Sequence, residues 1–352
     1  MRTGKQIGLV VLLMLVLSGG VLAQSDPVTL RVVTHDSFNV SEDVLNKFQE
    51  ESGITVEIVR LGDAGAMVNQ VVLSKDNPLG DVLYGIDNTF LSRGLDADIF
   101  EPYESPLLEN VPDDFKLDED MRVTPIDYGD ICLNFDVSYF EENQLTLPET
   151  LKDLTKPEYK GLLVTENPAT SSPGLAFLLA SVAVFGEEGD YTYLDYWADL
   201  VKNEVLVDED WSTAYYGDFT VPSEEGERPL VVSYASSPPA EVFFADPPVD
   251  NAPTGSVIAD DTCFRQIEFT GILKGTANLE AAQQFIDFML SVDFQNDMPL
   301  QMFVFPVNQE AELPEVFAEY AAIPEKSITL DSADIEKNRE GWIEKWTEVV
   351  LR

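Results

Sequence analysis

The sequence predicts an α/β protein made of two lobes. Short apolar strands alternate with helices of about ten residues between residues 29 and 87, and the same alternation resumes after residue 128. This alternation indicates a largely parallel sheet in each part. About 329 residues follow an N-terminal export segment, which is enough for two domains of roughly 150 residues each.

The export segment is predicted to be a signal peptide covering residues 1–23. Arg2 and Lys5 precede an apolar stretch over 7–17, and the small-residue cleavage site ends at Ala23. The alternative is an uncleaved anchor, but the stretch is short for a span of about 20 residues. We therefore expect a mature chain that begins at residue 24 and lies in the periplasm or elsewhere outside the cytoplasm.

Five elements are expected in the first lobe, which we place at residues 24–128. Ser41 is a helix cap and Gly53 a helix stop around an apolar face that includes Phe48. In order, the elements are a strand at 29–35, a helix at 41–52, a strand at 54–60, a helix at 64–74 and a strand at 81–87.

The second lobe is placed at 129–262, and a return segment at 263–352 completes the first. Expected strands of the second lobe are 128–135, 160–168, 205–211 and 229–239, with a helix after residue 171, another at 189–203 and a third from about 212. The return segment is expected to hold an extended stretch at 263–275, a helix at 279–291, a Pro-containing connection at 294–308 and a closing helix at 332–351.

Polar and aromatic residues follow several predicted strands. Ligands of open α/β sheets bind beyond the carboxyl ends of strands. This rule selects the loops 35–37, 61–65 and 87–89 in the first lobe. In the second lobe it selects Ser171, Ser172, Trp211 and the run from Tyr234 to Ser237.

The charge of the chain is strongly acidic. Its 64 Asp and Glu residues stand against 21 Lys and Arg, which gives a formal net charge of −43. Such a field repels nucleic acid and anionic lipid, and neither is expected as a partner. Most of these charges are interpreted as a solvated surface.

Several kinds of catalysis lack the residues they need. His35 is the one histidine, and no G-x-S-x-G elbow and no phosphate-cradling glycine loop occurs. Two cysteines and one histidine without ligand spacing argue against zinc, and we expect no cofactor. In an exported protein the pair Cys132 and Cys263 allows one disulfide.

The remaining candidates are binding groups. Aromatic faces beside a carboxylate suit a flat cationic ring, with an attraction of about 0.5–2 kcal/mol for each ring. The helix start at Ser171 and Ser172 suits a phosphate or hydroxyl group, and either serine could cap the helix. The aromatic candidates are Trp211, Tyr215, Tyr216, Tyr234 and Phe303, and the carboxylates are Asp63 and Asp87.

Nine stretches, taken in order, resemble the thiamine-binding receptors of bacterial ABC transporters. They cover nearly the whole mature chain, and the ordered series is more specific than any member. They are THDSF (34–38), LGDAG (61–65), GIDNT (85–89), PIDYG (125–129), PATSSPGL (168–175), DWSTAY (210–215), SYASSP (233–238), FQNDMPLQMFVFPVN (294–308) and ADIEKNREGWIEKW (333–346).

The resemblance implies a two-lobed periplasmic-binding-protein fold of type II, with hinge strands and a central cleft. It implies thiamine or thiamine monophosphate as ligand, a membrane permease as partner and a monomer. Adjacent hinge strands would also bring Cys132 and Cys263 together as a disulfide. The residues it places at the ligand are His35, Asp63, Ala64, Ser171, Ser172, Trp211, Tyr234, Ala235, Ser236, Ser237 and Phe303. His35 stands where the family usually has Tyr, and Phe303 where it usually has Trp.

Three other functions remain open. A ferric-ion receptor of the same fold could use His35, Asp63, Tyr215 and Tyr216 as hard ligands. An exported thiamine-degrading enzyme would need a nucleophile such as Cys in the cleft, whereas both cysteines fall at predicted hinge strands. A sensor subunit would bind its ligand through the same kinds of residues as a transport receptor, so the sequence does not separate the two functions.

Overall fold

A computed structural model describes residues 28–223 and 225–352. The predicted signal peptide lies outside these residues. Within the described ranges, no helix combines the length and the apolar character that a membrane span requires.

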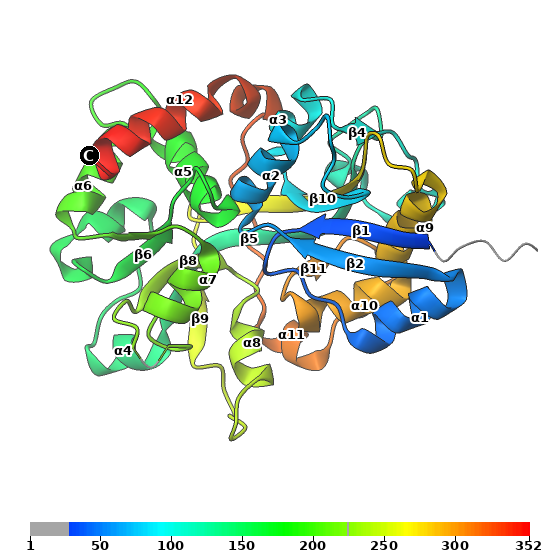
Figure 1. Ribbon diagram of the computed structural model, residues 1–352. Coiled ribbons are helices and arrows are strands. Elements are labelled where there is room, and N and C mark those ends of the chain that lie inside the picture. The colour runs from blue at the N-terminus through cyan, green and yellow to red at the C-terminus, as the bar shows by residue number, and fades with distance from the viewer. Residues whose placement is uncertain (1–27, 224) are drawn as a thin grey trace, which may run out of the picture.

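One continuous sheet of eleven strands runs through the described part of the chain (Figure 1). Its main path has the order β2-β1-β3-β10-β5-β8-β6-β7, and β4, β9 and β11 pair at its sides. The strands are β1 (Val28–Thr34), β2 (Ile54–Arg60), β3 (Val82–Asp87), β4 (Phe100–Glu101), β5 (Thr124–Asp136), β6 (Leu163–Glu166), β7 (Leu206–Asp208), β8 (Leu230–Tyr234), β9 (Thr254–Val257), β10 (Phe264–Leu273) and β11 (Phe305–Pro306).

The two long strands β5 and β10 connect the lobes. Pairing is parallel between β1, β2 and β3 on one side and between β6, β7 and β8 on the other. The connecting strands are antiparallel to each other and to β3 and β8, because the chain leaves the first lobe along β5 and returns along β10. The sheet is therefore mixed, and the largely parallel sheet that we predicted is limited to its two outer parts.

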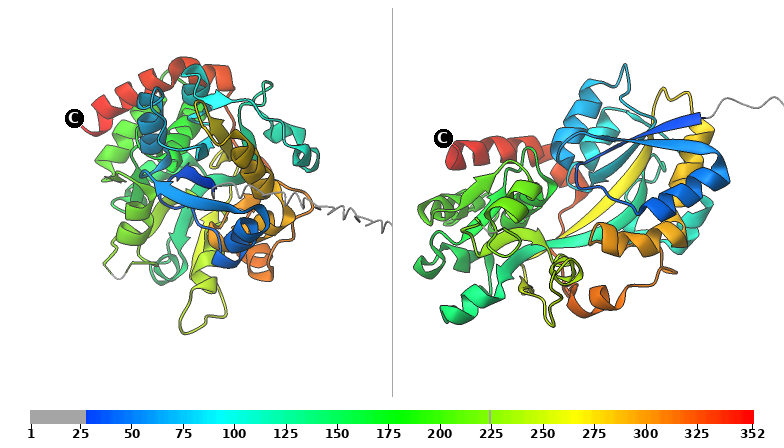
Figure 2. Two further views of the ribbon diagram at one scale, coloured as in Figure 1. Left: turned by 45° about the vertical axis from the view of Figure 1, so that its right-hand side comes forward. Right: turned by 60° about the horizontal axis from the view of Figure 1, so that its bottom comes forward.

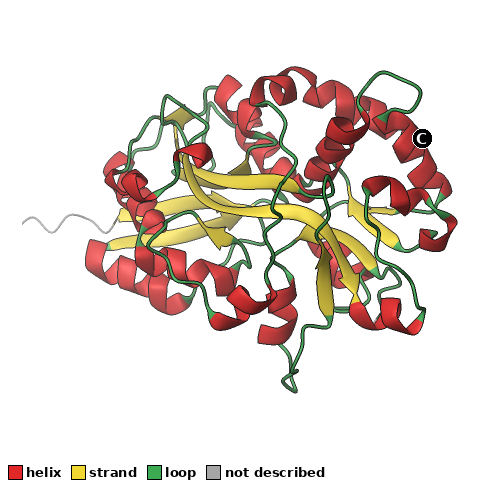
Figure 3. Ribbon diagram, turned by 180° about the vertical axis from the view of Figure 1, so that it is seen from behind, coloured by secondary structure: helices red, strands yellow, loops and turns green. Residues whose placement is uncertain are grey.

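Helices lie on both faces of the sheet (Figure 3). They are α1 (Glu42–Ser52), α2 (Ala64–Leu73), α3 (Leu91–Asp96), α4 (Val137–Glu142), α5 (Ser172–Phe185), α6 (Tyr193–Lys202), α7 (Trp211–Thr213), α8 (Pro238–Phe243), α9 (Leu279–Leu290), α10 (Val292–Gln301), α11 (Glu315–Tyr320) and α12 (Ser332–Val350). Short 3-10 helices are η1 (Pro106–Asn110), η2 (Asp113–Phe115), η3 (Leu151–Thr155) and η4 (Pro157–Tyr159), and η5 (Ala214–Asp218) is a short π-helix.

The first helix has the ends that the sequence predicts. The Ser41 hydroxyl accepts a hydrogen bond from the Val44 N–H at 3.4 Å, which satisfies a free donor of the first turn. Gly53 ends the helix with φ 71°, a conformation that glycine adopts without strain. The strand that follows, β2, has the predicted limits.

The connection predicted at 294–308 is wrong in its first half. Helix α10 runs from Val292 to Gln301 with Pro299 inside it, and the Ser291 hydroxyl caps its start. Phe294 and Met298 are buried against the first lobe. Their burial outweighs the one hydrogen bond that Pro299 cannot donate, since packing supplies most of the stability of helices in proteins.

The closing helix α12 packs on elements from both lobes, α6 and α3 (Figure 1). Trp346 on α12 meets Trp197 on α6 edge to face, with ring centres 5.5 Å apart. Figure 2 shows β5 and β10 side by side between the lobes. The predicted lobe boundaries at 128 and 262 stay predictions, and the first of them falls inside β5.

Candidate ligand-binding site

A cavity of about 360 Å³ opens between the lobes, at the strand ends that the sequence predicts. Both lobes and strand β10 contribute to it. It is lined by His35, Asp36, Ser37, Asp63, Ala64, Ser172, Pro173, Trp211, Ser212, Tyr215, Tyr216, Tyr234, Ser237, Ala240, Phe244, Glu268, Gln301, Met302, Phe303 and Val304. These residues include aromatic rings, hydroxyls and carboxylates, but no Lys or Arg.

Trp211 is the centre of an aromatic wall on the second lobe. Its ring stacks on Tyr215 with centres 4.8 Å apart and an interplanar angle of 22°, and Tyr216 meets it edge-on at 5.5 Å. The Trp211 indole N–H donates to the Ser233 hydroxyl at 3.0 Å, and this hydrogen bond fixes the orientation of the indole ring. The adjacent tyrosines of the π-helical segment η5 differ in exposure: Tyr215 is buried, whereas Tyr216 is 54% exposed.

Asp63 joins the two lobes across the cavity. It caps α2 by accepting from the Ala64 N–H at 2.6 Å, and its second oxygen accepts from the Trp211 N–H at 3.1 Å. Burial raises the pKa of Asp63, although these N–H groups and the Ser171 hydroxyl oppose the rise. Both carboxylate oxygens are thus already used by the protein.

The start of α5 differs from the predicted hydroxyl cap. Ser171 occupies the cap position, but its side chain makes no capping hydrogen bond. The Ser172 hydroxyl donates to Asp87 at the end of β3, across the interlobe boundary. The other Asp87 oxygen accepts from the N–H and hydroxyl of Thr89. The prediction that one of these serines caps the helix through its hydroxyl is wrong: Asp87 binds the Ser172 hydroxyl, and the Ser171 hydroxyl makes no capping bond.

The ionisation of Asp87 is expected to lower the free energy of unfolding as the pH rises. Burial raises its pKa to about 6, from an ordinary value of 3.8, because the charged form is poorly solvated. The folded state therefore holds this proton more tightly than the unfolded state. The contribution of Asp87 is fully present below about pH 4 and is lost as the pH rises through about 6, a change of about 3 kcal/mol.

The measurement is urea unfolding of the natural protein and Asp87→Asn between pH 4 and 7.5. The variant keeps a neutral side chain of the same shape, so the difference between the two proteins isolates this titration. We expect the natural protein to lose stability relative to the variant as the pH rises. A difference that stays constant with pH would contradict the assignment.

His35 and Glu268 form the inner end of the cavity. Both side chains are buried, and His35 Nε2 lies 3.6 Å from a Glu268 oxygen. The second Glu268 oxygen lies 3.0 Å from the Tyr84 hydroxyl, which lies 2.6 Å from Asp127. The Glu268 carboxylate raises the pKa of His35, although burial alone would lower it. Here a carboxylate on β10 and the histidine after β1 meet at the cavity.

Comparison with known proteins assigns the chain to a family. A family model described as bacterial extracellular solute-binding protein matches residues 77–336. The chain belongs to this family. A thiamine-binding periplasmic protein of Brucella suis is 30% identical over 332 residues, with 92% of each chain covered. One of Escherichia coli is 28% identical over 328 residues, covering 92% of this chain and 94% of the relative.

A solved structure supports the fold of this solute-binding protein. A periplasmic thiamin binding protein superposes with a TM-score of 0.79 at 26% identity, and the match covers 92% of this chain and 96% of that one. The predicted two-lobed fold of type II is thereby confirmed.

Of the eleven residues of the solute-binding protein that the resemblance places at the ligand, eight line the cavity, and so does the predicted binding residue Tyr215. The other three, Ser171, Ala235 and Ser236, are fully buried behind its wall. Both backbone polar groups of Ala235 are hydrogen-bonded to other parts of the protein. Its N–H donates to the Asp130 carbonyl at 2.8 Å, and its own carbonyl accepts from the Ala322 N–H at 3.0 Å. These three residues can shape the wall without lining it.

Glu268 and Phe244 are lining residues that sequence reasoning missed. Glu268 stands at a polar position of the alternating run Ile267-Glu268-Phe269-Thr270, so the pattern of this strand does not mark it as a cavity residue. Phe244 follows α8, is 67% exposed and meets Phe303 across the cavity mouth with ring centres 5.6 Å apart. No local pattern marks Phe244, because its role depends on where α8 ends in space.

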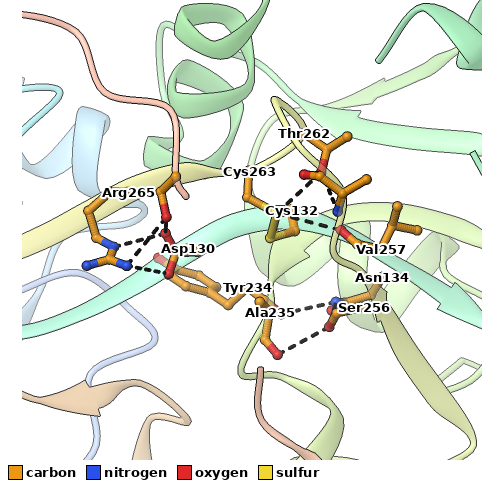
Figure 4. Close-up of a disulfide and its surroundings, with 12 residues drawn as sticks. Asp130, Cys132, Asn134, Tyr234, Ala235, Ser256, Val257, Thr262, Cys263 and Arg265 are labelled. Atoms are coloured by element: carbon orange, nitrogen blue, oxygen red, sulfur yellow. Dashed lines mark hydrogen bonds and ion pairs between the residues drawn. A yellow bond between two sulfur atoms is a disulfide. The ribbon is translucent and has the colours of Figure 1, made fainter. Parts of the chain in front are cut away.

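The cysteines of the solute-binding protein form a disulfide next to the cavity wall (Figure 4). Cys132 lies on β5 and Cys263 directly precedes β10, so the bond links the two connecting strands. Both sulfurs are buried beside Ala235. The bond therefore ties β5 to β10 close to the strand that carries Tyr234.

No metal centre is evident in the described ranges. Within them, no three side chains of His, Cys, Asp or Glu gather so that they could hold an ion. The ferric alternative also depends on tyrosines, and Tyr215 donates its hydroxyl to Glu241 at 3.0 Å. Burial raises the pKa of Tyr215 well above its ordinary value, which disfavours the tyrosinate form.

Proposed function

We propose that this solute-binding protein is a receptor that binds thiamine in the interlobe cavity and delivers it to an ABC permease. One observation carries the proposal: a stacked aromatic wall faces carboxylates in a cavity whose lining has no Lys or Arg. Thiamine joins a flat pyrimidine to a flat cationic thiazolium ring. Aromatic faces attract such a cation, and carboxylates balance its charge. The names of the relatives support the same ligand.

The phosphorylation state of the ligand is part of the proposal. We propose thiamine or thiamine monophosphate, bound by a monomer. The Ser172 hydroxyl at the start of α5 already donates its hydrogen bond to Asp87. The negative charge of this carboxylate would repel a highly charged anion bound at the same helix start. These features favour ligands with few phosphate charges over the pyrophosphate.

Closure of the lobes is proposed to convert binding into transport. Two side-chain contacts already cross between the lobes, from Trp211 N–H to Asp63 and from the Ser172 hydroxyl to Asp87. A ligand stacked on Trp211 would lie beside both contacts. We propose that it stabilises the closed form, which the permease then recognises.

The role is proposed to be binding without catalysis. An enzyme that degrades thiamine would need a free nucleophile in the cleft, and both cysteines of the chain are in the disulfide. Purified protein should therefore leave the absorbance spectrum of thiamine unchanged over hours. Turnover of thiamine would contradict a receptor role.

Titration calorimetry tests the proposed ligand. Thiamine, its monophosphate, its pyrophosphate and ferric citrate are each added to the mature protein. We expect one thiamine site of micromolar or tighter affinity. Absence of binding by every thiamine form would refute the proposal. A visible charge-transfer band with iron would favour the ferric alternative, which uses His35, Asp63, Tyr215 and Tyr216.

A further inference from the structure

Glu268 is a buried carboxylate that faces the cavity from a strand connecting the two lobes. It lies on β10, is 5% exposed and belongs to the cavity lining. An ionised carboxylate in such a place is costly unless something compensates its charge. The groups around it therefore indicate whether it is charged and what it faces.

The hydrogen bonds behind Glu268 locate one proton. The Tyr84 hydroxyl lies within hydrogen-bond distance of both Asp127 and Glu268 but has a single hydrogen to donate. One of the two carboxyl groups must therefore be protonated for both contacts to be hydrogen bonds. Asp127 is 1% exposed and forms no ion pair within the part of the chain that the structure describes, whereas Glu268 faces His35. The proton accordingly belongs on Asp127.

The pKa shifts agree with this placement. Burial and the neighbouring Glu268 charge raise the pKa of Asp127 well above its ordinary range. The pKa of Glu268 is lowered despite burial, because His35 and the hydroxyl of Tyr84 stabilise the charged form. Glu268 is thus the anionic member of the group.

His35 is the basic group of the described lining that lies next to Glu268, and the two form an ion pair without a hydrogen bond. His35 Nε2 is 3.6 Å away, beyond hydrogen-bond length, and makes no hydrogen bond. The other polar neighbours of Glu268 are the amide of Gln266 at 3.5 Å, the hydroxyl of Tyr84 and the carboxyl group of Asp127. Because His35 makes no hydrogen bond to this carboxylate, a cationic ligand in the cavity would share it with His35.

The other two acidic residues of the lining are less suited to this task. Both oxygens of Asp63 already accept backbone hydrogen bonds. Asp36 is exposed, where water and salt screen its charge. Charge recognition is strongest where water is excluded, and among these three carboxylates Glu268 is the most buried.

We propose that Glu268 is the specificity-determining residue that recognises the positive charge of the ligand. Its carboxylate pairs with the cationic ring from the inner end of the cavity, while the aromatic wall around Trp211 recognises ring shape. Tyr84 and protonated Asp127 hold Glu268 in place from behind. This inference rests on the proposed function, because it requires a flat cationic ligand.

The test compares thiamine with 3-deazathiamine, a neutral isostere in which carbon replaces the charged ring nitrogen. Calorimetry measures both ligands on the mature protein and on Glu268→Gln. A buried charged contact contributes about 1.5–3 kcal/mol, so we expect the natural protein to prefer thiamine by roughly 10- to 100-fold. In Glu268→Gln this preference should fall by about tenfold or more, through weaker thiamine binding and unchanged binding of the neutral isostere.

Asp81→Asn is the matched control. Asp81 is also a buried carboxylate, and it accepts hydrogen bonds from the Arg31 N–H and the Thr276 hydroxyl. It precedes β3, at the end opposite to the cavity. The same acid-to-amide change there should leave both affinities unaltered.

Each outcome supports or overturns the inference. A preference for thiamine that persists in Glu268→Gln would assign charge recognition to the aromatic rings. Equal loss of both ligands would show a structural role instead. Equal binding of the two ligands by the natural protein would overturn the inference even if the variant failed to fold. Absence of binding by thiamine itself would refute the proposed function.

Discussion

Trp211→Ala is expected to weaken thiamine binding by about 10- to 100-fold, because stacking a base on an aromatic side chain contributes roughly 1–3 kcal/mol. The substitution removes the central ring of the wall and leaves Tyr215 without its stacking partner. Calorimetry measures the loss. Fluorescence gives a second readout, because the three other tryptophans are buried away from the cavity lining. Quenching by thiamine should therefore disappear in the variant.

Trp211→Phe is the control for this prediction. It keeps an aromatic face but loses the indole N–H that bonds Ser233. We expect an affinity between those of the natural protein and Trp211→Ala. Natural affinity in Trp211→Ala would show that the ligand does not stack on this wall.

Removal of the disulfide is expected to destabilise the protein by about 5 kcal/mol if chain entropy dominates. The bond joins residues separated by 131 positions, so it closes a long loop and strongly restricts the unfolded chain. Urea unfolding of Cys132→Ala/Cys263→Ala should show a lower midpoint than the natural protein. Alanine is preferred over serine because both sites are buried and alanine adds no polar group that would have to leave water on folding.

Reduction of the natural protein is the companion measurement. It breaks the same bond without changing the sequence, and it should lower the unfolding midpoint to a similar extent. Thiamine affinity should change little in either case, since neither cysteine lines the cavity. An unchanged midpoint in both experiments would mean that the bond adds nothing to stability.

Local chemistry explains which elements were predictable. Strand 54–60 has the predicted limits, because Gly53 stops the preceding helix and alternation marks the strand. The closing helix at 332–350 is also close to its predicted span. Such signals depend on neighbouring residues alone. Pro299 shows the limit of this reasoning, since it indicates a connection locally but lies in a helix held by packing.

The residues of the cavity also fall into those that the sequence predicts and those that it does not. Aromatic and hydroxyl residues at strand ends were identifiable, because α/β sheets bind ligands at that edge. The roles of Glu268 and Asp87 were hidden among 64 acidic residues. Each acquires its role from a partner far along the chain, His35 for one and Ser172 for the other.

The sequence by itself determined the α/β class, most elements and the aromatic composition of the site, because periodicity, caps and strand-end residues act over a few positions. The family membership was likewise visible from the ordered stretches. Only the tertiary structure decided that the connecting strands are antiparallel, that Ser172 bonds Asp87, and that Glu268 faces the cavity. These features depend on contacts between residues far apart in the chain, which no local pattern encodes.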